Sequence, residues 1–135
     1  MSEAAAKLAT KPMTAHEISH GVISAALKVH SALGPGLLES AYERCLCHEF
    51  EGNAVPYARQ VELPIEYDGL RLDCGYRADI IVADTVILEI KSIDRILPIH
   101  EAQLLTYLRI SQCRIGLLIN FNTTSLKNGL RRCVL

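Results

Sequence analysis

Apolar residues recur at helical spacing in the first part of the chain. From residue 14 to residue 33 they return every three or four positions, and Thr14 with Glu17 forms a capping box at the start. Gly34-Pro35-Gly36 then ends the pattern. A second helical pattern follows and ends near Gly52, with an apolar side made of Leu38, Ala41, Tyr42, Cys45, Leu46 and Phe50. The pattern predicts two helices before any strand.

The spacing of apolar residues changes to two after residue 60. Alternation from Val61 to Tyr67 and from Leu70 to Tyr76 predicts two strands, and Asp68-Gly69 between them is a strong hairpin signal. Pro64 places the first strand at an edge or on a bulge, because proline donates no ladder hydrogen bond. We expect the second strand to continue to Asp79, on the face opposite its apolar residues.

Two acids and a lysine interrupt the most apolar hairpin of the sequence. Glu89 and Lys91 share a face, because alternate side chains of a strand do. If the turn is centred on Asp84, Asp79 lies directly across from Glu89. Buried carboxylates are costly unless a cation compensates them, and two of them provide the oxygen ligands that Mg²⁺ prefers. The alternative is a solvated face with surface ion pairs; the apolar run at 80–82 argues against it.

The remaining pattern predicts a helix and two further strands. The helix extends from Ile99 to Ser111 with Pro98 in its first turn, and Gln103 and Tyr107 lie on one side of it. The apolar segment 114–121 predicts a strand that is parallel to the one before the helix. A polar loop and a short strand at 130–135 follow. This order indicates an α/β fold, a mixed sheet flanked by helices.

Composition limits the remaining possibilities. The 135 residues, half of them hydrophobic, fit a single domain over 14–135 with a flexible N-terminal tail over 1–13. No apolar run approaches the roughly 20 residues of a membrane helix. A net charge of −1 argues mildly against strong non-specific binding of nucleic acid. Five scattered cysteines are expected to be buried free thiols in a reducing cytoplasm, with an iron–sulfur cluster as the weaker alternative.

Several short motifs, taken in order, resemble one known family. They are Gly36-Leu-Leu-Glu39-Ser-Ala-Tyr42, Asp79 followed by Glu89-Ile90-Lys91, and Gln103-Leu-Leu-Thr-Tyr107. Over about residues 16 to 134 the chain resembles the GxxExxY proteins, which are placed in the PD-(D/E)XK nuclease superfamily. Ala78 stands where the superfamily name has proline, a position that carries no chemistry.

The resemblance implies a restriction-endonuclease-like fold with a central mixed four-stranded sheet flanked by helices. It also implies a catalytic set of Asp79, Glu89, Lys91, Glu39, Gln103 and Tyr107. One or two divalent ions, Mg²⁺ or Mn²⁺, would be held by Asp79, Glu89, Glu39 and the backbone carbonyl of Ile90. In this interpretation Lys91 acts on the attacking water or on the transition state, and Gln103 and Tyr107 line the site.

Each of these assignments has a structural alternative. Without the resemblance, Glu39 is interpreted as a surface helix acid, and Gln103 and Tyr107 equally well as a core amide–phenol pair. His30 and His100 are interpreted as helix histidines, with His100 kept as a candidate substrate contact.

The leading prediction for function is a Mg²⁺-dependent nuclease that hydrolyses phosphodiester bonds. The alternative is a non-catalytic module with the same fold that binds nucleic acid or assembles a complex; the intact acids and lysine favour the enzyme. The expected partner is nucleic acid, with DNA favoured over RNA. A homodimer or larger complex could supply the binding surface that a small, nearly neutral chain lacks. A cytoplasmic protein without a membrane segment is expected.

Overall fold

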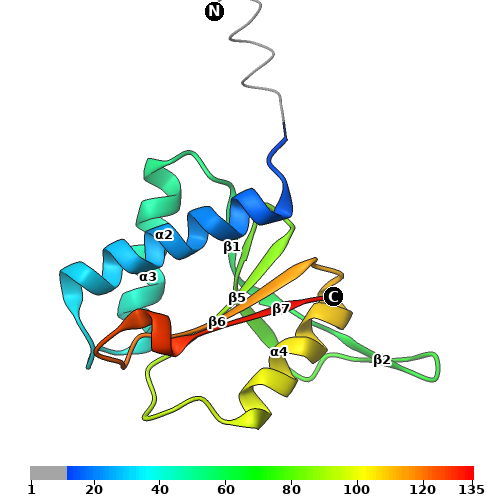
Figure 1. Ribbon diagram of the computed structural model, residues 1–135. Helices are drawn as coiled ribbons and strands as arrows, with labels where there is room; N and C mark the ends of the chain where they lie inside the picture. Colours follow the sequence, from blue (N-terminus) through cyan, green and yellow to red (C-terminus); the bar gives the residue numbers. More distant parts are fainter. Residues whose placement is uncertain (1–11) are drawn as a thin grey trace, which may run out of the picture.

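The computed structural model describes residues 12–135. Of the tail expected over 1–13, all but the last two residues lie outside this part. The elements, shown in Figure 1, are α2 (Ala15–Leu33), α3 (Glu39–Gly52), β1 (Tyr57–Glu62), β2 (Ile65–Tyr67), β3 (Leu70–Leu72), β4 (Arg77–Val82), β5 (Val86–Lys91), α4 (Pro98–Ser111), β6 (Ile115–Asn120), the short 3₁₀ helix η1 (Leu126–Gly129) and β7 (Leu130–Val134).

The main sheet has the strand order β1-β4-β5-β6-β7. Among the strands of residues 12–135, only β5 and β6 are parallel neighbours, and α4 connects them, as the strand–helix–strand pattern predicts. The other neighbours are antiparallel, so the sheet is mixed as expected. It has five strands where four were expected, because Leu130–Val134 pairs along β6 and adds an edge strand.

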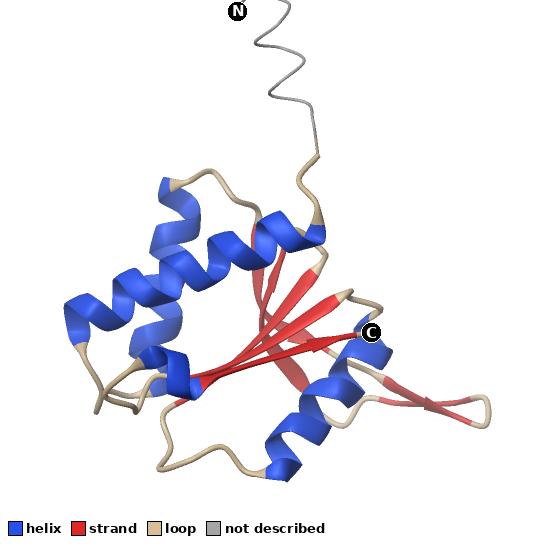
Figure 2. Ribbon diagram, in the orientation of Figure 1, coloured by secondary structure: helices blue, strands red, loops and turns tan. Residues whose placement is uncertain are grey.

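Helices cover both faces of this sheet (Figure 2). On one face α2 and α3 bury a large apolar cluster, which includes Ile80, Val82 and Leu88. On the other face α4 packs over a smaller cluster, against which Ile81 lies. Consecutive residues of β4 therefore contact two different cores, which explains why the run at 80–82 lacks polar residues.

The predicted helix ends are confirmed. The Thr14 hydroxyl accepts a hydrogen bond from the Glu17 backbone, and the Glu17 carboxylate accepts one from Thr14, which completes the capping box. Gly34, with φ of 68°, ends α2. Pro98 begins α4. Within residues 12–135, no helix combines the length and the apolar character that a membrane crossing requires.

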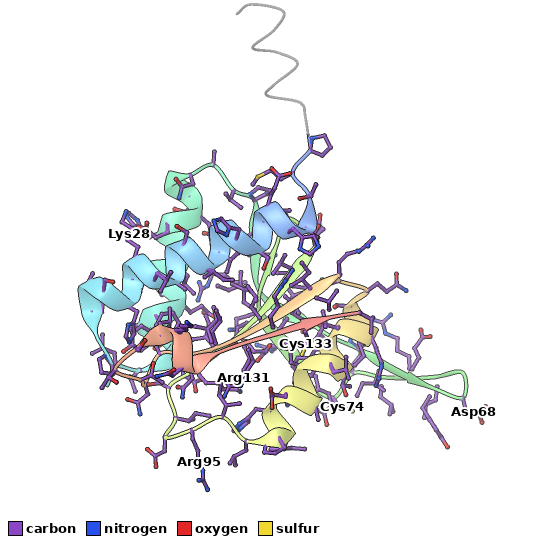
Figure 3. The ribbon with its side chains drawn as sticks, in the orientation of Figure 1. Lys28, Asp68, Cys74, Arg95, Arg131 and Cys133 are labelled. Atoms are coloured by element: carbon purple, nitrogen blue, oxygen red, sulfur yellow. The ribbon has the colours of Figure 1, made fainter. Side chains whose placement is uncertain are left out.

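The first predicted strand is wrong in its length. Val61–Tyr67 is divided by Pro64: β1 ends at Glu62, and β2 begins at Ile65 in a different sheet. β2 and β3 form a separate two-stranded ribbon that projects from the body, with Asp68 at its tip (Figures 1 and 3). Proline cannot donate a ladder hydrogen bond, and here it marks the point where the chain leaves the main sheet.

The second predicted strand is interrupted in the same way. It was expected to run from Leu70 to Asp79, but β3 ends at Leu72 and β4 begins at Arg77. Gly75 between them has φ of 79°, a left-handed conformation that turns the chain back into the main sheet. Asp79 therefore belongs to β4, a strand of the main sheet that is separate from the ribbon.

Two burial predictions are also wrong. Leu38 is 76% exposed, because it precedes the first turn of α3 and does not lie on the helix's apolar side. Cys47 is buried there instead. All five cysteines are free thiols, but Cys74 is exposed in the segment that follows the ribbon (Figure 3).

Candidate active site

Asp79 and Glu89 face each other at the point where strands β4 and β5 separate. The ladder pairs Val82 with Val86 and ends at Ile80 with Leu88, so the same register extended by one residue places Asp79 opposite Glu89. Side chains replace the ladder there. The Asp79 amide donates to Glu89 Oε1 at 3.3 Å, and the Ile90 amide donates to Asp79 Oδ2 at 2.7 Å. Each acid is thus fixed by the backbone of the opposite strand.

The Asp79 and Glu89 carboxylates lack enough nearby positive charge to balance two negative charges. Glu89 is only 6% exposed, and burial, then the charge of Asp79, raise its pKa from 4.5 to about 8. Burial also raises the pKa of the half-buried Asp79, against the lowering effect of the hydrogen bond from Ile90. At neutral pH Glu89 therefore keeps its proton unless a cation replaces it. The donor chemistry fits a hard divalent ion, which two carboxylate oxygens bind well.

The backbone of Ile90 contributes to the same place. Its N–H donates to Asp79, and the N–H and C=O of one strand residue point toward the same neighbouring strand. The Ile90 carbonyl therefore points toward β4, beyond the end of the β4–β5 ladder. Ile90 also lines a cavity of about 220 Å³ together with Asp79, so an additional oxygen ligand is available there.

Lys91 ends β5 on the face of Glu89. It is half-buried, and its positive charge lowers the pKa of both Asp79 and Glu89. Lys91 makes no ion pair with any residue in the described part of the chain. Its ammonium group is thus close to the acids and is available to an anionic ligand.

Gln103 and Tyr107 are neighbouring residues on one side of α4. The Gln103 side-chain amide donates to the Tyr107 hydroxyl at 3.1 Å, so they do form an amide–phenol pair. Burial raises the pKa of Tyr107, and the negative charges of Glu89 and Asp79 raise it further. The amide–phenol interpretation is thus confirmed by this hydrogen bond, and the role of the pair in lining the site stays a prediction.

Glu39 reaches the site from the start of α3. Its Oε1 accepts a hydrogen bond from the Ser92 amide at 3.3 Å, and its side chain lines the cavity together with Asp79. Within residues 12–135, no three side chains of His, Cys, Asp or Glu are grouped closely enough to hold a metal ion. Glu39 thus lines the same cavity as Asp79 and does not join the acid pair in a compact cluster.

Two further polar residues of this cavity, Glu43 and Gln60, are absent from the site predicted from the sequence. Glu43 is 6% exposed and accepts hydrogen bonds from Arg59 at 2.8 Å and from Gln60 at 2.7 Å. Glu43 and Gln60 line the cavity beside Asp79. The spacing of four between Glu39 and Glu43 places both on one side of α3, a signal that could have found Glu43. No sequence signal marks Gln60.

His30 and His100 each make a hydrogen bond to the protein backbone. His30 Nε2 is 2.8 Å from the Thr123 carbonyl, and His100 Nδ1 accepts a hydrogen bond from the Leu97 amide at the start of α4. The interpretation of both as helix histidines agrees with these contacts.

A mixed sheet between helices, with opposed acids and a lysine at the end of its central hairpin, defines a nuclease-like α/β protein. Residues 16–133 match the family model of the PD-(D/E)XK nuclease superfamily. The chain belongs to this superfamily, and its fold is restriction-endonuclease-like. Comparison with curated proteins found no match, and comparison with solved structures found none either. The narrower resemblance to GxxExxY proteins stays a prediction.

Proposed function

We propose that this protein is a Mg²⁺- or Mn²⁺-dependent nuclease of the GxxExxY type that hydrolyses phosphodiester bonds. One observation carries the proposal: Asp79 and Glu89 lie opposite each other, fixed by backbone hydrogen bonds, with both pKa values raised. An acid pair of this kind is unfavourable without a cation. PD-(D/E)XK nucleases generally use divalent metals, which is consistent with this need.

The residues that would hold the cation are Asp79, Glu89 and the Ile90 carbonyl, with Glu39 completing the ligand set from α3. A divalent ion at such a site polarises a phosphate and lowers the pKa of a bound water. The protein's contribution is a set of oxygen atoms that backbone hydrogen bonds hold in place before any substrate arrives.

Lys91 provides the positive charge for the substrate. Its side chain shares the face of Glu89 and makes no ion pair among the described residues, so it can contact a phosphate oxygen or orient the attacking water. Gln103 and Tyr107 would line this side of the site, which is consistent with the effect of both acids on the pKa of Tyr107. We expect DNA as the substrate in preference to RNA, and action in the cytoplasm.

The test is a cleavage assay with a matched lysine control. Single- and double-stranded DNA and RNA are incubated with Mg²⁺, Mn²⁺ or EDTA. We compare the wild type, Lys91→Ala and Lys127→Ala, the last of which removes an exposed lysine from η1. Cleavage that needs the metal and is lost only in Lys91→Ala supports the proposal. Binding without cleavage under all conditions would replace it by a non-catalytic binding module.

A further inference from the structure

Two neighbouring residues of β1 bind the same buried carboxylate. Arg59 Nη2 donates to Glu43 Oε2 at 2.8 Å, and Gln60 Nε2 donates to Glu43 Oε1 at 2.7 Å. Adjacent side chains of a regular strand point to opposite faces, so both could not normally reach one acid. The backbone of β1 must therefore depart from regular strand geometry here.

The departure is at Gln60, whose φ is 50°. Among the described non-glycine residues with positive φ, it alone lies within a strand; the others are in turns or next to a helix end. The ladder with β4 pairs Arg59 with Ile80 and Val61 with Ala78, and it omits Gln60 and Asp79 between them. Left-handed backbone is unfavourable for a residue with a Cβ atom, so the rest of the fold must impose it.

The contact with Glu43 also determines which way the amide of Gln60 points. A carboxylate only accepts hydrogen bonds, so the NH₂ group must face Glu43 and Oε1 must point elsewhere. Within residues 12–135, no side chain or backbone group donates a hydrogen bond to Oε1, and Gln60 is exposed at the rim of the cavity. An oriented acceptor therefore borders the cavity that Asp79 and Ile90 also line.

We infer that Gln60 is a water-positioning residue of the proposed nuclease, and that Glu43 with Arg59 positions Gln60. The Gln60 Oε1 accepts a hydrogen bond from a water in the cavity beside Asp79. The Glu43–Arg59 pair keeps the amide in this orientation and maintains the left-handed backbone. This inference depends on the proposed function, because the water it orients is one that the metal site would bind.

The chain offers a matched control. Gln112 is also an exposed glutamine with left-handed backbone, φ of 60°, but it lies at the end of α4 and lines none of the site's cavity. Gln60→Ala and Gln112→Ala therefore make the same chemical change on the same kind of backbone. Gln60→Asn is a second site variant: asparagine tolerates left-handed backbone well, but its amide is one carbon shorter.

Two measurements are made on each variant: the Mn²⁺ dissociation constant by calorimetry, and the cleavage rate at saturating Mn²⁺. Gln60→Ala should weaken Mn²⁺ binding and lower kcat by about tenfold to a hundredfold, the usual effect of removing a group that supports a metal site, with KM unchanged. Gln112→Ala should match the wild type. If Gln60→Ala does not fold, Gln60→Asn is used in its place, with the same expectation.

Glu43 tests the positioning step. Glu43→Gln should lower kcat by a smaller factor, because the Gln60 amide loses its fixed orientation but remains present. If Glu43 acts through Gln60, the same change in the Gln60→Ala background should lower kcat no further. A purely structural role of Glu43 would instead add its loss to that of Gln60→Ala.

Failure of this inference is distinct from failure of the proposed function. If the wild type binds Mn²⁺ and cuts but Gln60→Ala behaves like Gln112→Ala, the inference is overturned and the nuclease stands. If the wild type binds Mn²⁺ but cuts nothing, the nuclease is rejected, and the role of Gln60 in positioning a water for cleavage is rejected with it. If the wild type does not bind Mn²⁺, both are overturned.

Discussion

Replacing Glu89 by glutamine should stabilise the metal-free protein at alkaline pH. Glutamine keeps the shape of the side chain, and its carbonyl oxygen can still accept the hydrogen bond from the Asp79 amide. It removes the group whose pKa is raised from 4.5 to about 8. The burial cost of a second negative charge beside Asp79 disappears with it.

The pH dependence follows from the two pKa values. In the unfolded chain Glu89 loses its proton near 4.5, whereas in the folded protein it keeps the proton up to about 8. The folded state therefore binds more protons across this interval, and the free energy of unfolding falls as pH rises. At about 1.4 kcal/mol for each tenfold change, the loss from Glu89 amounts to at most about 5 kcal/mol. Asp79, whose pKa is also raised, adds a loss of the same sign.

Urea denaturation in EDTA, at intervals from pH 4.5 to pH 8.5, measures this effect. The wild type should lose stability steadily over the range, and Glu89→Gln should lose far less. Glu66→Gln, a change of the same kind on the exposed ribbon, serves as the control and should follow the wild type. Parallel curves for the wild type and Glu89→Gln would refute the buried, proton-holding state of Glu89.

Three further predictions concern the cation, the lysine and a close backbone contact. Millimolar Mg²⁺ or Mn²⁺ should raise the melting temperature of the wild type, because an ion that binds only the folded state stabilises it; Glu89→Gln should show no rise, and an equal rise in both would indicate non-specific ion effects. Lys91→Ala should reduce single-turnover cleavage by about a hundredfold to a thousandfold, about 2.7–4 kcal/mol, while the metal-induced rise in melting temperature remains. Gly129→Ala should strongly lower the melting temperature, because its Cβ would lie 2.1 Å from the Asn120 carbonyl oxygen; circular dichroism measures this, and an unchanged value would contradict it.

The sequence predicted the acid pair well because two local rules define it. A period of two determines which residues share a face, and the turn position determines which residues lie opposite. With the turn centred on Asp84, these rules place Asp79 across from Glu89 and Lys91 on the same face, as the structure shows. Neither rule needs information from distant parts of the chain.

The ribbon and Gln60 could not be predicted in this way. Alternation is the same for a strand in the main sheet and for one in a separate ribbon, so the breaks at Pro64 and Gly75 were underestimated. The left-handed conformation of Gln60 depends on a carboxylate 17 residues away on α3. Local preference disfavours that conformation, and only the tertiary contact with Glu43 and the pairing of Arg59 explain it.

The candidate site lies where regular pairing of the sheet stops on both sides of β4. Toward β5 the ladder ends at Ile80, and toward β1 it omits Gln60. A complete ladder satisfies its own backbone groups and leaves none for a ligand. Where it is interrupted, side chains satisfy the backbone amides at Asp79 and Ile90, and Ile90 and Gln60 line the same cavity. Helix α3 supplies Glu39 and Glu43 beside the same interruption of the sheet. Free backbone groups and several carboxylates therefore occur at one place, and this combination is what suits the site to a cation.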